Sequence, residues 1–272
     1  MGKGDLDAGQ SALSRRKLLE LTGCAGVAAA LSACSNSRPE RSPEASATAT
    51  ATAETAPLAP APLATTAPPS TSTLPGISKP LLCRDAWGAA PIRPGGIEQI
   101  PDRMTLHHSA VNFDDNRTIT ARLRQHQRYH QDDHGWIDIA YHVAVDRKGN
   151  LFALRPTNLV GNTATDYDPT GHFLVLVEGN FDEQEVTEEQ LNGAAVAFAW
   201  AAQKWGITSN TLMGHRDVPA ATSCPGASLE AHISSGDLKK RVDDLLVAGP
   251  VELRDVCGPE AEAIVANIEA GL

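Results

Sequence analysis

Beyond residue 100, apolar and polar positions recur with the periods expected of strands and helices. Alternation of apolar and polar residues predicts strands over Arg103 to Val111, Ile137 to Asp146 and Leu151 to Arg155. The run Phe173 to Glu178 is almost continuously apolar, which is typical of a central strand that is buried on both faces. A last short strand is predicted over Thr211 to Gly214.

Three segments between and after these strands carry helical signals. Thr118 to Gln131 places Ile119 and Leu123 on one side of a predicted helix. The tetrad Thr187-Glu188-Glu189-Gln190 is a capping box, and it opens a helix that should end at Gly206. Leu229 to Leu246 is predicted to be helical. The pattern therefore predicts one α/β domain, a mixed central β-sheet flanked by helices.

Composition changes sharply before this domain. Residues 35–78 are almost all Ala, Pro, Thr and Ser, so they lack the apolar surface needed to offset chain entropy. We interpret them as a disordered tether, residues 79–248 as a single folded domain, and residues 249–272 as a C-terminal tail of unassigned role. The formal charge is −10 and no clustered basic face is visible, which argues against a nucleic-acid partner.

Residues 1–34 have the features of an export signal. Arg15 and Arg16 precede an apolar run that is too short for a permanent transmembrane helix. The paired arginines resemble the signal of the Tat pathway, and Leu31-Ser32-Ala33-Cys34 resembles a lipobox. Cys34 would then carry lipid and anchor the protein to the outer face of the cytoplasmic membrane, in the cell envelope. The alternative is a plain secretory signal with a chance cysteine.

The sequence also offers ligands for a metal ion. In GHRDVPAATSCPG, His215 and Cys224 stand nine residues apart across a loop, and imidazole and thiolate are ligands that Zn²⁺ prefers. His107 lies upstream in MTLHHSA, at the end of a short apolar run within a predicted strand. Three protein ligands with a fourth position left open is the arrangement of a catalytic zinc site.

Cysteine usage is consistent with export. The chain has five cysteines, and Cys24 would leave with the signal, while Cys34 takes lipid and Cys224 takes metal. Cys83 and Cys257 remain, at the two edges of the folded part. In an oxidising compartment they could form a disulfide, although two unpaired thiols stay possible.

Five motifs occur in order along the chain: WGA, LHHSA, GWIDIAYHVAVDRKGNLFALR, VEGNFD and GHRDVPAATSCPG. Together they resemble the zinc-dependent type 2 N-acetylmuramoyl-L-alanine amidases, a family that includes the peptidoglycan recognition proteins, from about Trp87 to about Leu229. The resemblance implies hydrolysis of the amide that joins N-acetylmuramic acid to L-alanine, with Zn²⁺ as cofactor and peptidoglycan or muropeptide as substrate. We expect a monomer.

The resemblance also implies roles for single residues. It places the metal on His107, His215 and Cys224, and it places the catalytic phenol, which would donate to the developing oxyanion, on Tyr141. The alternative for Tyr141 is core packing. Another position in the same motifs carries Thr222, either a second donor or a local partner of the backbone.

Some relatives also use a glutamate from the strand that reads FLVLVEG here. The best-matched position is Leu176, and Glu178 lies two residues further on the same face. Glu178 could serve as general base or form a structural hydrogen bond.

Substrate-binding positions follow from the same motifs. Relatives line the substrate groove at the positions of His130 and His142. Gly135 and Trp136, with Arg155, resemble the combination found in relatives that prefer diaminopimelate to lysine in the peptide stem. A guanidinium can pair with the extra carboxylate of diaminopimelate, so we expect Arg155 to contact it.

Two uncertainties concern the metal ligand and the reaction class. The family's usual spacing from His215 ends on Ser223, but the chemistry of zinc favours Cys224, with the extra residue absorbed around positions 219–221. The remaining histidines are expected not to bind metal, and His126 and His134 look exposed. The rival function is a peptidoglycan-binding module without catalysis. A zinc peptidase would need an HExxH helix, which the sequence lacks.

Overall fold

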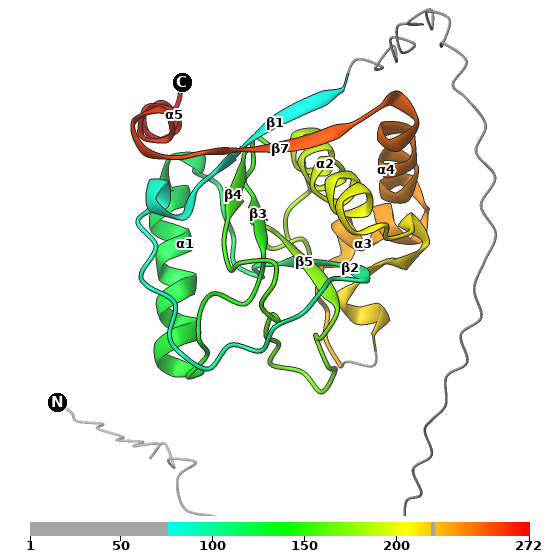
Figure 1. The fold of residues 1–272 in the computed structure, drawn as a ribbon, viewed down its shortest axis with the longest axis horizontal. Coiled ribbons are helices and arrows are strands. Elements are labelled where there is room, and N and C mark those ends of the chain that lie inside the picture. Colours follow the sequence, from blue (N-terminus) through cyan, green and yellow to red (C-terminus); the bar gives the residue numbers. More distant parts are fainter. Residues whose placement is uncertain (1–75, 219–220) are drawn as a thin grey trace, which may run out of the picture. The chain divides into compact units, whose positions relative to one another are not determined.

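The computed structural model describes residues 76–218 and 221–272, which contain a mixed seven-stranded sheet (Figure 1). The strand order is β6-β2-β5-β3-β4-β1-β7, and only the pairing of β3 with β4 is antiparallel. The mixed sheet predicted from the sequence is confirmed. The strands are β1 Ile77–Leu82, β2 Arg103–His108, β3 Val143–Val145, β4 Leu151–Ala153, β5 His172–Val177, β6 Leu212–Gly214 and β7 Val251–Val256.

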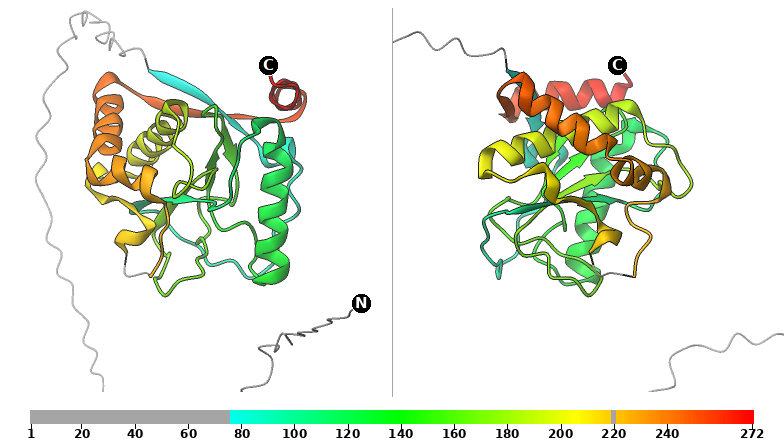
Figure 2. Two further views of the ribbon diagram at one scale, coloured as in Figure 1. Left: turned by 180° about the vertical axis from the view of Figure 1, so that it is seen from behind. Right: turned by 90° about the vertical axis from the view of Figure 1, so that its right-hand side faces the viewer.

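Helices cover both faces of this sheet (Figure 2). Helices α2, α3 and α4 pack on one face, and α1 and α5 pack on the other. None of the helices in the described segments is long and apolar enough to cross a membrane. The helices are α1 Ile119–Arg128, α2 Glu188–Trp205, α3 Ala227–Ser234, α4 Asp237–Ala248 and α5 Gly258–Ala270, with short turns η1 Arg84–Trp87, η2 Asn116–Thr118, η3 Tyr129–Asp133, η4 Ser209–Thr211 and η5 His215–Asp217.

Strand β5 lies in the middle of the sheet, and all six of its residues are buried. Val175 and Val177 pack toward α2, whereas Leu176 belongs to the core beneath α1. Burial on both faces explains why this strand is continuously apolar in sequence, as predicted. Since β5 pairs with β2 on one side and β3 on the other, it fixes the positions of the residues that follow both strands.

Helix α2 begins and ends where the sequence predicts. The Thr187 side chain accepts a hydrogen bond from Gln190 N at 3.1 Å, and the Gln190 side chain reaches back to Thr187 N at 3.2 Å. Gly206 ends the helix with a φ of 69°, a left-handed conformation that glycine adopts without steric cost. The predicted helix from Leu229 to Leu246 is instead divided into α3 and α4, because Gly236 has a φ of 78° and interrupts the turn pattern.

The sheet extends beyond the domain boundary predicted at Ala248. Strand β7 pairs with β1 over six residues, and a disulfide joins Cys83 to Cys257 just after both strands. Helix α5 then covers the core beneath α1, and Thr120 Oγ1 donates to Glu269 at 2.6 Å. The C-terminal residues therefore form an edge strand and a covering helix. The predicted export signal and the tether up to residue 75 lie outside the described residues.

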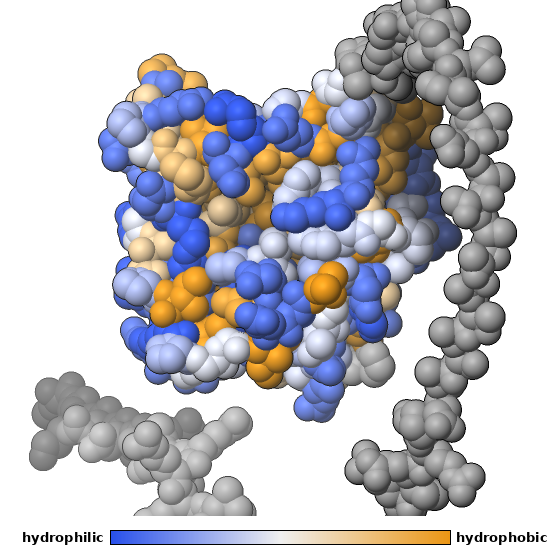
Figure 3. Space-filling model, in the orientation of Figure 1, coloured by the Kyte–Doolittle hydropathy of each residue, from blue (hydrophilic) through white to orange (hydrophobic). Residues whose placement is uncertain are grey.

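The surface on the face of Figure 1 is mostly polar, and its apolar residues form small separate patches (Figure 3). Large exposed apolar side chains include Ile97, Ile100 and Tyr129. The predicted strand from Ile137 to Asp146 is shorter than expected: only Val143–Val145 pairs in the sheet. The residues before it, from Asp138 to Tyr141, leave the sheet and carry side chains of the candidate site.

Candidate functional site

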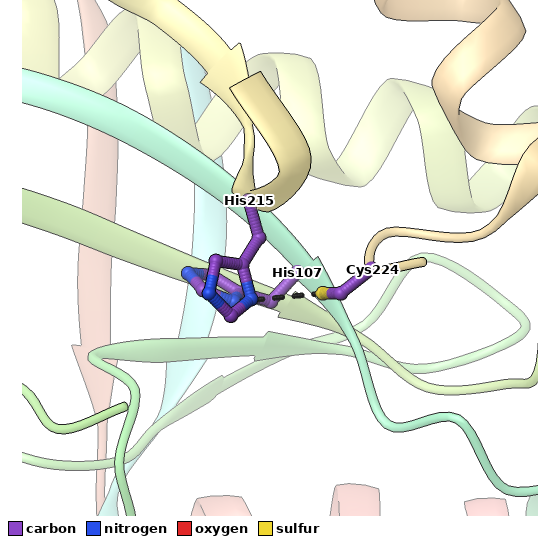
Figure 4. A group of neighbouring side chains, drawn as sticks. All are labelled: His107, His215 and Cys224. Carbon is purple, nitrogen blue, oxygen red and sulfur yellow. Dashed lines mark hydrogen bonds between the residues drawn. The ribbon is translucent and has the colours of Figure 1, made fainter. Parts of the chain in front are cut away.

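Three side chains with metal-binding atoms meet where β2 and β6 end (Figure 4). Leu106 of β2 is paired with Gly214 of β6, so the next residues, His107 and His215, lie side by side. Cys224 comes from the loop that precedes α3, and its Sγ lies 3.6 Å from His107 Nδ1. Each residue offers one ligand atom, and these atoms all lie within 4.8 Å of one another.

The chemistry of this donor set fits a zinc ion. All three side chains are buried, and His107 is only 1% exposed. Burial lowers the pKa of His107 well below its ordinary value and that of His215 to about 4, so both rings are neutral at pH 7 and offer a lone pair. Burial also raises the pKa of the Cys224 thiol to about 12, so binding of a metal ion would displace its proton.

The outer nitrogens of both rings have partners in the loop between β4 and β5. Thr165 Oγ1 lies 2.8 Å from His215 Nε2, and Tyr167 OH lies 3.5 Å from His107 Nε2. With Nε2 engaged, Nδ1 is the atom left for a metal, and in His107 it is the atom that faces the thiol. Thr165 and Tyr167 were not among the predicted site residues, because this loop carries none of the recognised motifs.

Tyr141 lies beside the cluster. Its ring centroid is 5.1 Å from that of His107, and the side chain is partly buried. Burial raises the pKa of the Tyr141 phenol above its ordinary value, so the hydroxyl keeps its proton at neutral pH. The phenol is therefore a hydrogen-bond donor next to the candidate metal ligands.

The loop from His215 to Cys224 is braced at both ends. Arg216 N donates to Cys224 O at 2.9 Å, and the Arg216 guanidinium donates to Ser223 O. Thr222 Oγ1 accepts from Cys224 N at 3.1 Å, which is the local backbone role considered for it. The sulfur of Cys224, rather than the hydroxyl of Ser223, thus joins the histidines. The bulge predicted around positions 219–221 falls partly on residues 219–220, outside the described residues.

Two of the predicted substrate-binding residues form a row of rings with Tyr141. The centroid of His130 lies 5.9 Å from Tyr141 and 5.0 Å from Trp136. Trp136 in turn stacks on His134 at 4.3 Å. Gly135, just before Trp136, is exposed and has a φ of 71°, which allows the chain to turn between these two rings.

His142 lies deeper than predicted. Its Nδ1 accepts from Leu174 N at 2.9 Å, and its Nε2 lies 2.9 Å from Leu159 O. The ring is buried and stacks on Phe173. Because both ring nitrogens are engaged inside the domain, His142 braces the sheet and has no nitrogen left for a ligand.

Arg155 is also committed to the interior. It is 2% exposed, and its guanidinium donates to three backbone carbonyls, those of Asp138, Ile139 and Val160, as well as to Asn162 Oδ1. Four of its five N–H groups are therefore used within the protein. This arrangement does not support the predicted contact with a substrate carboxylate. Instead, the guanidinium joins the segment before Tyr141 to the start of the loop that carries Thr165.

Glu178 and His126 are paired. The Glu178 side chain is fully buried, and its two carboxylate oxygens lie 3.2 and 3.3 Å from His126 Nε2. His126 was expected to be exposed, but only 13% of its side chain is accessible, because α1 packs it against the end of β5. A carboxylate with no accessible surface has no direct path to substrate.

Comparisons with known proteins agree with these motifs. A family model described as N-acetylmuramoyl-L-alanine amidase matches residues 98–227. Peptidoglycan-recognition protein LB of Drosophila melanogaster is 31% identical over 162 residues, which cover 57% of this chain and 68% of that protein. The human N-acetylmuramoyl-L-alanine amidase is 32% identical over 154 residues, 54% of this chain and 26% of the human protein.

Solved structures of the Drosophila recognition protein LB share the fold. The wild-type structure is 27% identical, covers 58% of this chain and 94% of its own, and has a TM-score of 0.52. A mutant of the same protein, solved in complex with tracheal cytotoxin, is 26% identical with a TM-score of 0.52, covering 57% of this chain and 93% of its own.

Proposed function

The chain belongs to the N-acetylmuramoyl-L-alanine amidase family, and we propose that it is a zinc hydrolase which cleaves the amide between N-acetylmuramic acid and L-alanine in peptidoglycan. The observation that carries this proposal is the cluster of His107, His215 and Cys224 with Tyr141 beside it. Two imidazoles and a thiol can hold a zinc ion with a fourth position open, and a protonated phenol can donate to a developing oxyanion.

Each residue has a part in this reaction. When bound by the three ligands, zinc supplies a Lewis acid for the amide carbonyl and lowers the pKa of water. The Tyr141 phenol donates a hydrogen bond to the carbonyl oxygen, and this bond strengthens as negative charge develops there. Thr165 and Tyr167 hold the rings of the two histidines in a fixed orientation.

The rival function is a recognition module that binds peptidoglycan without cleaving it. Binding alone would not require a thiol and two imidazoles to be buried with their ligand atoms facing one another, whereas a zinc site does. The presence of all three ligands together with Tyr141 supports the enzyme. The complex of the Drosophila relative with tracheal cytotoxin, a monomeric diaminopimelic acid-type peptidoglycan, supports a muropeptide as the ligand class for either function.

The test is release of free stem peptide from a muropeptide by the full chain loaded with zinc. The proposed reaction gives a new amino terminus on L-alanine and a free lactyl carboxylate on the sugar. A chelator should abolish the release, and added zinc should restore it. Binding of muropeptide without any zinc-dependent release would favour the recognition module.

We further propose that the protein is exported and held by lipid at Cys34, on the outer face of the cytoplasmic membrane, where its substrate lies. This rests on the paired arginines and the lipobox-like segment of the sequence. Labelling of cells with a fatty-acid analogue should mark the wild-type chain but not Cys34→Ala. Equal labelling of both chains would contradict the anchor.

A further inference from the structure

The buried carboxylate of Glu178 has one partner among the described residues. Glu178 follows β5 and is fully buried, with Oε1 and Oε2 at 3.2 and 3.3 Å from His126 Nε2. One N–H can donate to only one of these oxygens at a time, and Oε1 has no further hydrogen-bond donor. The carboxylate therefore depends on the His126 ring for its stability in the interior.

This dependence fixes the ring of His126. To satisfy the carboxylate, the ring must carry its proton on Nε2, since an unprotonated Nε2 would face the oxygens with a lone pair. A ring that carries a single proton, and carries it on Nε2, has its acceptor lone pair on Nδ1. That atom forms no hydrogen bond with any residue of the described segments, so Glu178 orients His126 and leaves one nitrogen for another partner.

The pair lies next to the candidate catalytic residues. Leu176, two residues before Glu178, is paired with His107 in the sheet, so the carboxylate and the metal ligand project from the same face. The His126 ring stacks on His130 at 6.4 Å, and His130 lies 5.9 Å from Tyr141. Only His126 of the buried pair reaches the surface. His126 thus extends the row of rings that begins beside the metal ligands.

We propose that His126, oriented by Glu178, is a further substrate-binding residue whose Nδ1 accepts a hydrogen bond from an N–H group in the peptide part of the substrate. Peptide stems present backbone N–H groups, which are donors of the kind that this nitrogen can accept. Glu178 is then a positioning residue that acts through His126 and is not the general base itself. The inference rests on the proposed function, because it takes a muramyl peptide as the ligand.

The test measures binding rather than turnover, so that it does not depend on zinc. The dissociation constant of N-acetylmuramyl pentapeptide is measured by calorimetry at pH 8 with the full chain freed of metal. Loss of one hydrogen bond in His126→Leu should raise it about 3- to 10-fold. Glu178→Leu should raise it similarly, because the ring loses its orientation, whereas Glu178→Gln should stay near the wild type, since the amide oxygen still accepts from Nε2.

The double variant His126→Leu with Glu178→Leu should bind no more weakly than His126→Leu alone, because the two changes remove the same interaction with the substrate. A matched control is His232→Leu, which removes a histidine from another carboxylate pair, 2.8 Å from Asp237, away from the row of rings. The control should bind as the wild type does. After reloading with zinc, every variant should contain the same amount of zinc as the wild type. A variant whose structure near His107 is disturbed would contain less.

The outcomes separate this inference from the proposed function. If the wild type does not bind the muramyl peptide, the proposed function fails. If the wild type binds and His126→Leu binds equally well, the role of His126 is wrong and the proposed function stands. If His126→Leu weakens binding but Glu178→Leu does not, Glu178 does not position the ring.

Discussion

Replacement of Arg155 by methionine tests whether the guanidinium stabilises the fold or selects the substrate. The guanidinium is buried and donates to three backbone carbonyls and to Asn162. Burial lowers its pKa to about 10, so it remains charged at pH 7. Arg155→Met keeps an unbranched apolar stem but removes the guanidinium, so these buried acceptors lose their donors.

The expected cost follows from those acceptors. Each buried carbonyl left without a donor costs about 1 to 3 kcal/mol, and part of this is offset because a buried charge is also removed. We expect the free energy of unfolding to fall by about 3 to 5 kcal/mol, which is near the lower end of the sum over these acceptors because of that offset. Arg155→Lys should lose an intermediate amount, because an ammonium cannot reach all four acceptors.

The assay is urea unfolding of the full chain at pH 7, with Arg254→Met as the control. Arg254 is half-exposed and pairs with Glu260, so its loss should cost less than about 1 kcal/mol. In parallel, kcat/KM is compared for diaminopimelate-type and lysine-type muropeptides, and Arg155→Lys should keep the wild-type ratio. If Arg155→Met is as stable as the control and loses a preference for diaminopimelate, the guanidinium contacts substrate and the structural role is refuted.

Three further predictions concern the site and the core. Tyr141→Phe should lower kcat about 10²- to 10³-fold with zinc content unchanged, while Tyr129→Phe turns over normally. Thr165→Val removes the shorter hydroxyl contact to His215 Nε2 and leaves only Thr163 Oγ1 at 3.4 Å, so it should weaken zinc binding about 10- to 100-fold in competition with a chelator; equal affinity would contradict its orienting role. Burial lowers the pKa of His142 from 6.5 to about 4, so the unfolded chain binds more protons between these values, and the stabilisation is complete above pH 6.5. This contribution should fall by about 3 kcal/mol as the pH drops to 4. Because burial also lowers the pKa of His108, His130, His172 and other histidines, His142→Gln should reduce the total fall seen by urea unfolding by about that amount and not abolish it.

The periodicity of apolar residues predicted those helices and strands whose burial follows one pattern from end to end. Strand β5 is buried on both faces, so its apolar run is unbroken, and α2 has a complete capping box at Thr187 and a glycine at its end. The division between α3 and α4 was missed because Gly236 inside an amphipathic pattern is compatible with a continuous helix. Only its φ of 78° marks the break.

The candidate site was predicted where short motifs carry it, and missed where contacts come from distant segments. His107 and His215 become neighbours because β2 and β6 pair, and motif order indicated this. The burial of Arg155 could not be predicted, because its neighbours in the sequence do not show whether its guanidinium donates to carbonyls or faces solvent. The pairing of His126 with Glu178 joins residues 52 positions apart, and no local pattern announces it.

The C-terminal strand and helix were also missed, for a different reason. Strand β7 has only six residues, and the alternation of buried and exposed positions breaks at Arg254 and Asp255, so its pattern is hard to distinguish from that of a polar tail. Its place is set by pairing with β1 and by the disulfide between Cys83 and Cys257, both of which are long-range contacts. The disulfide itself was one of two alternatives left by cysteine usage.

The central claim is that Cys224 completes a zinc site which hydrolyses the muramyl amide. The most direct measurement is zinc content together with release of stem peptide for Cys224→Ser and Ser223→Ala, prepared side by side with the wild type. The Cys224 sulfur lies 3.6 Å from His107 Nδ1, so Cys224→Ser should lose both zinc and activity, because a neutral hydroxyl is a poor zinc ligand. Ser223→Ala should keep both. Stoichiometric zinc and wild-type turnover in Cys224→Ser would contradict the account.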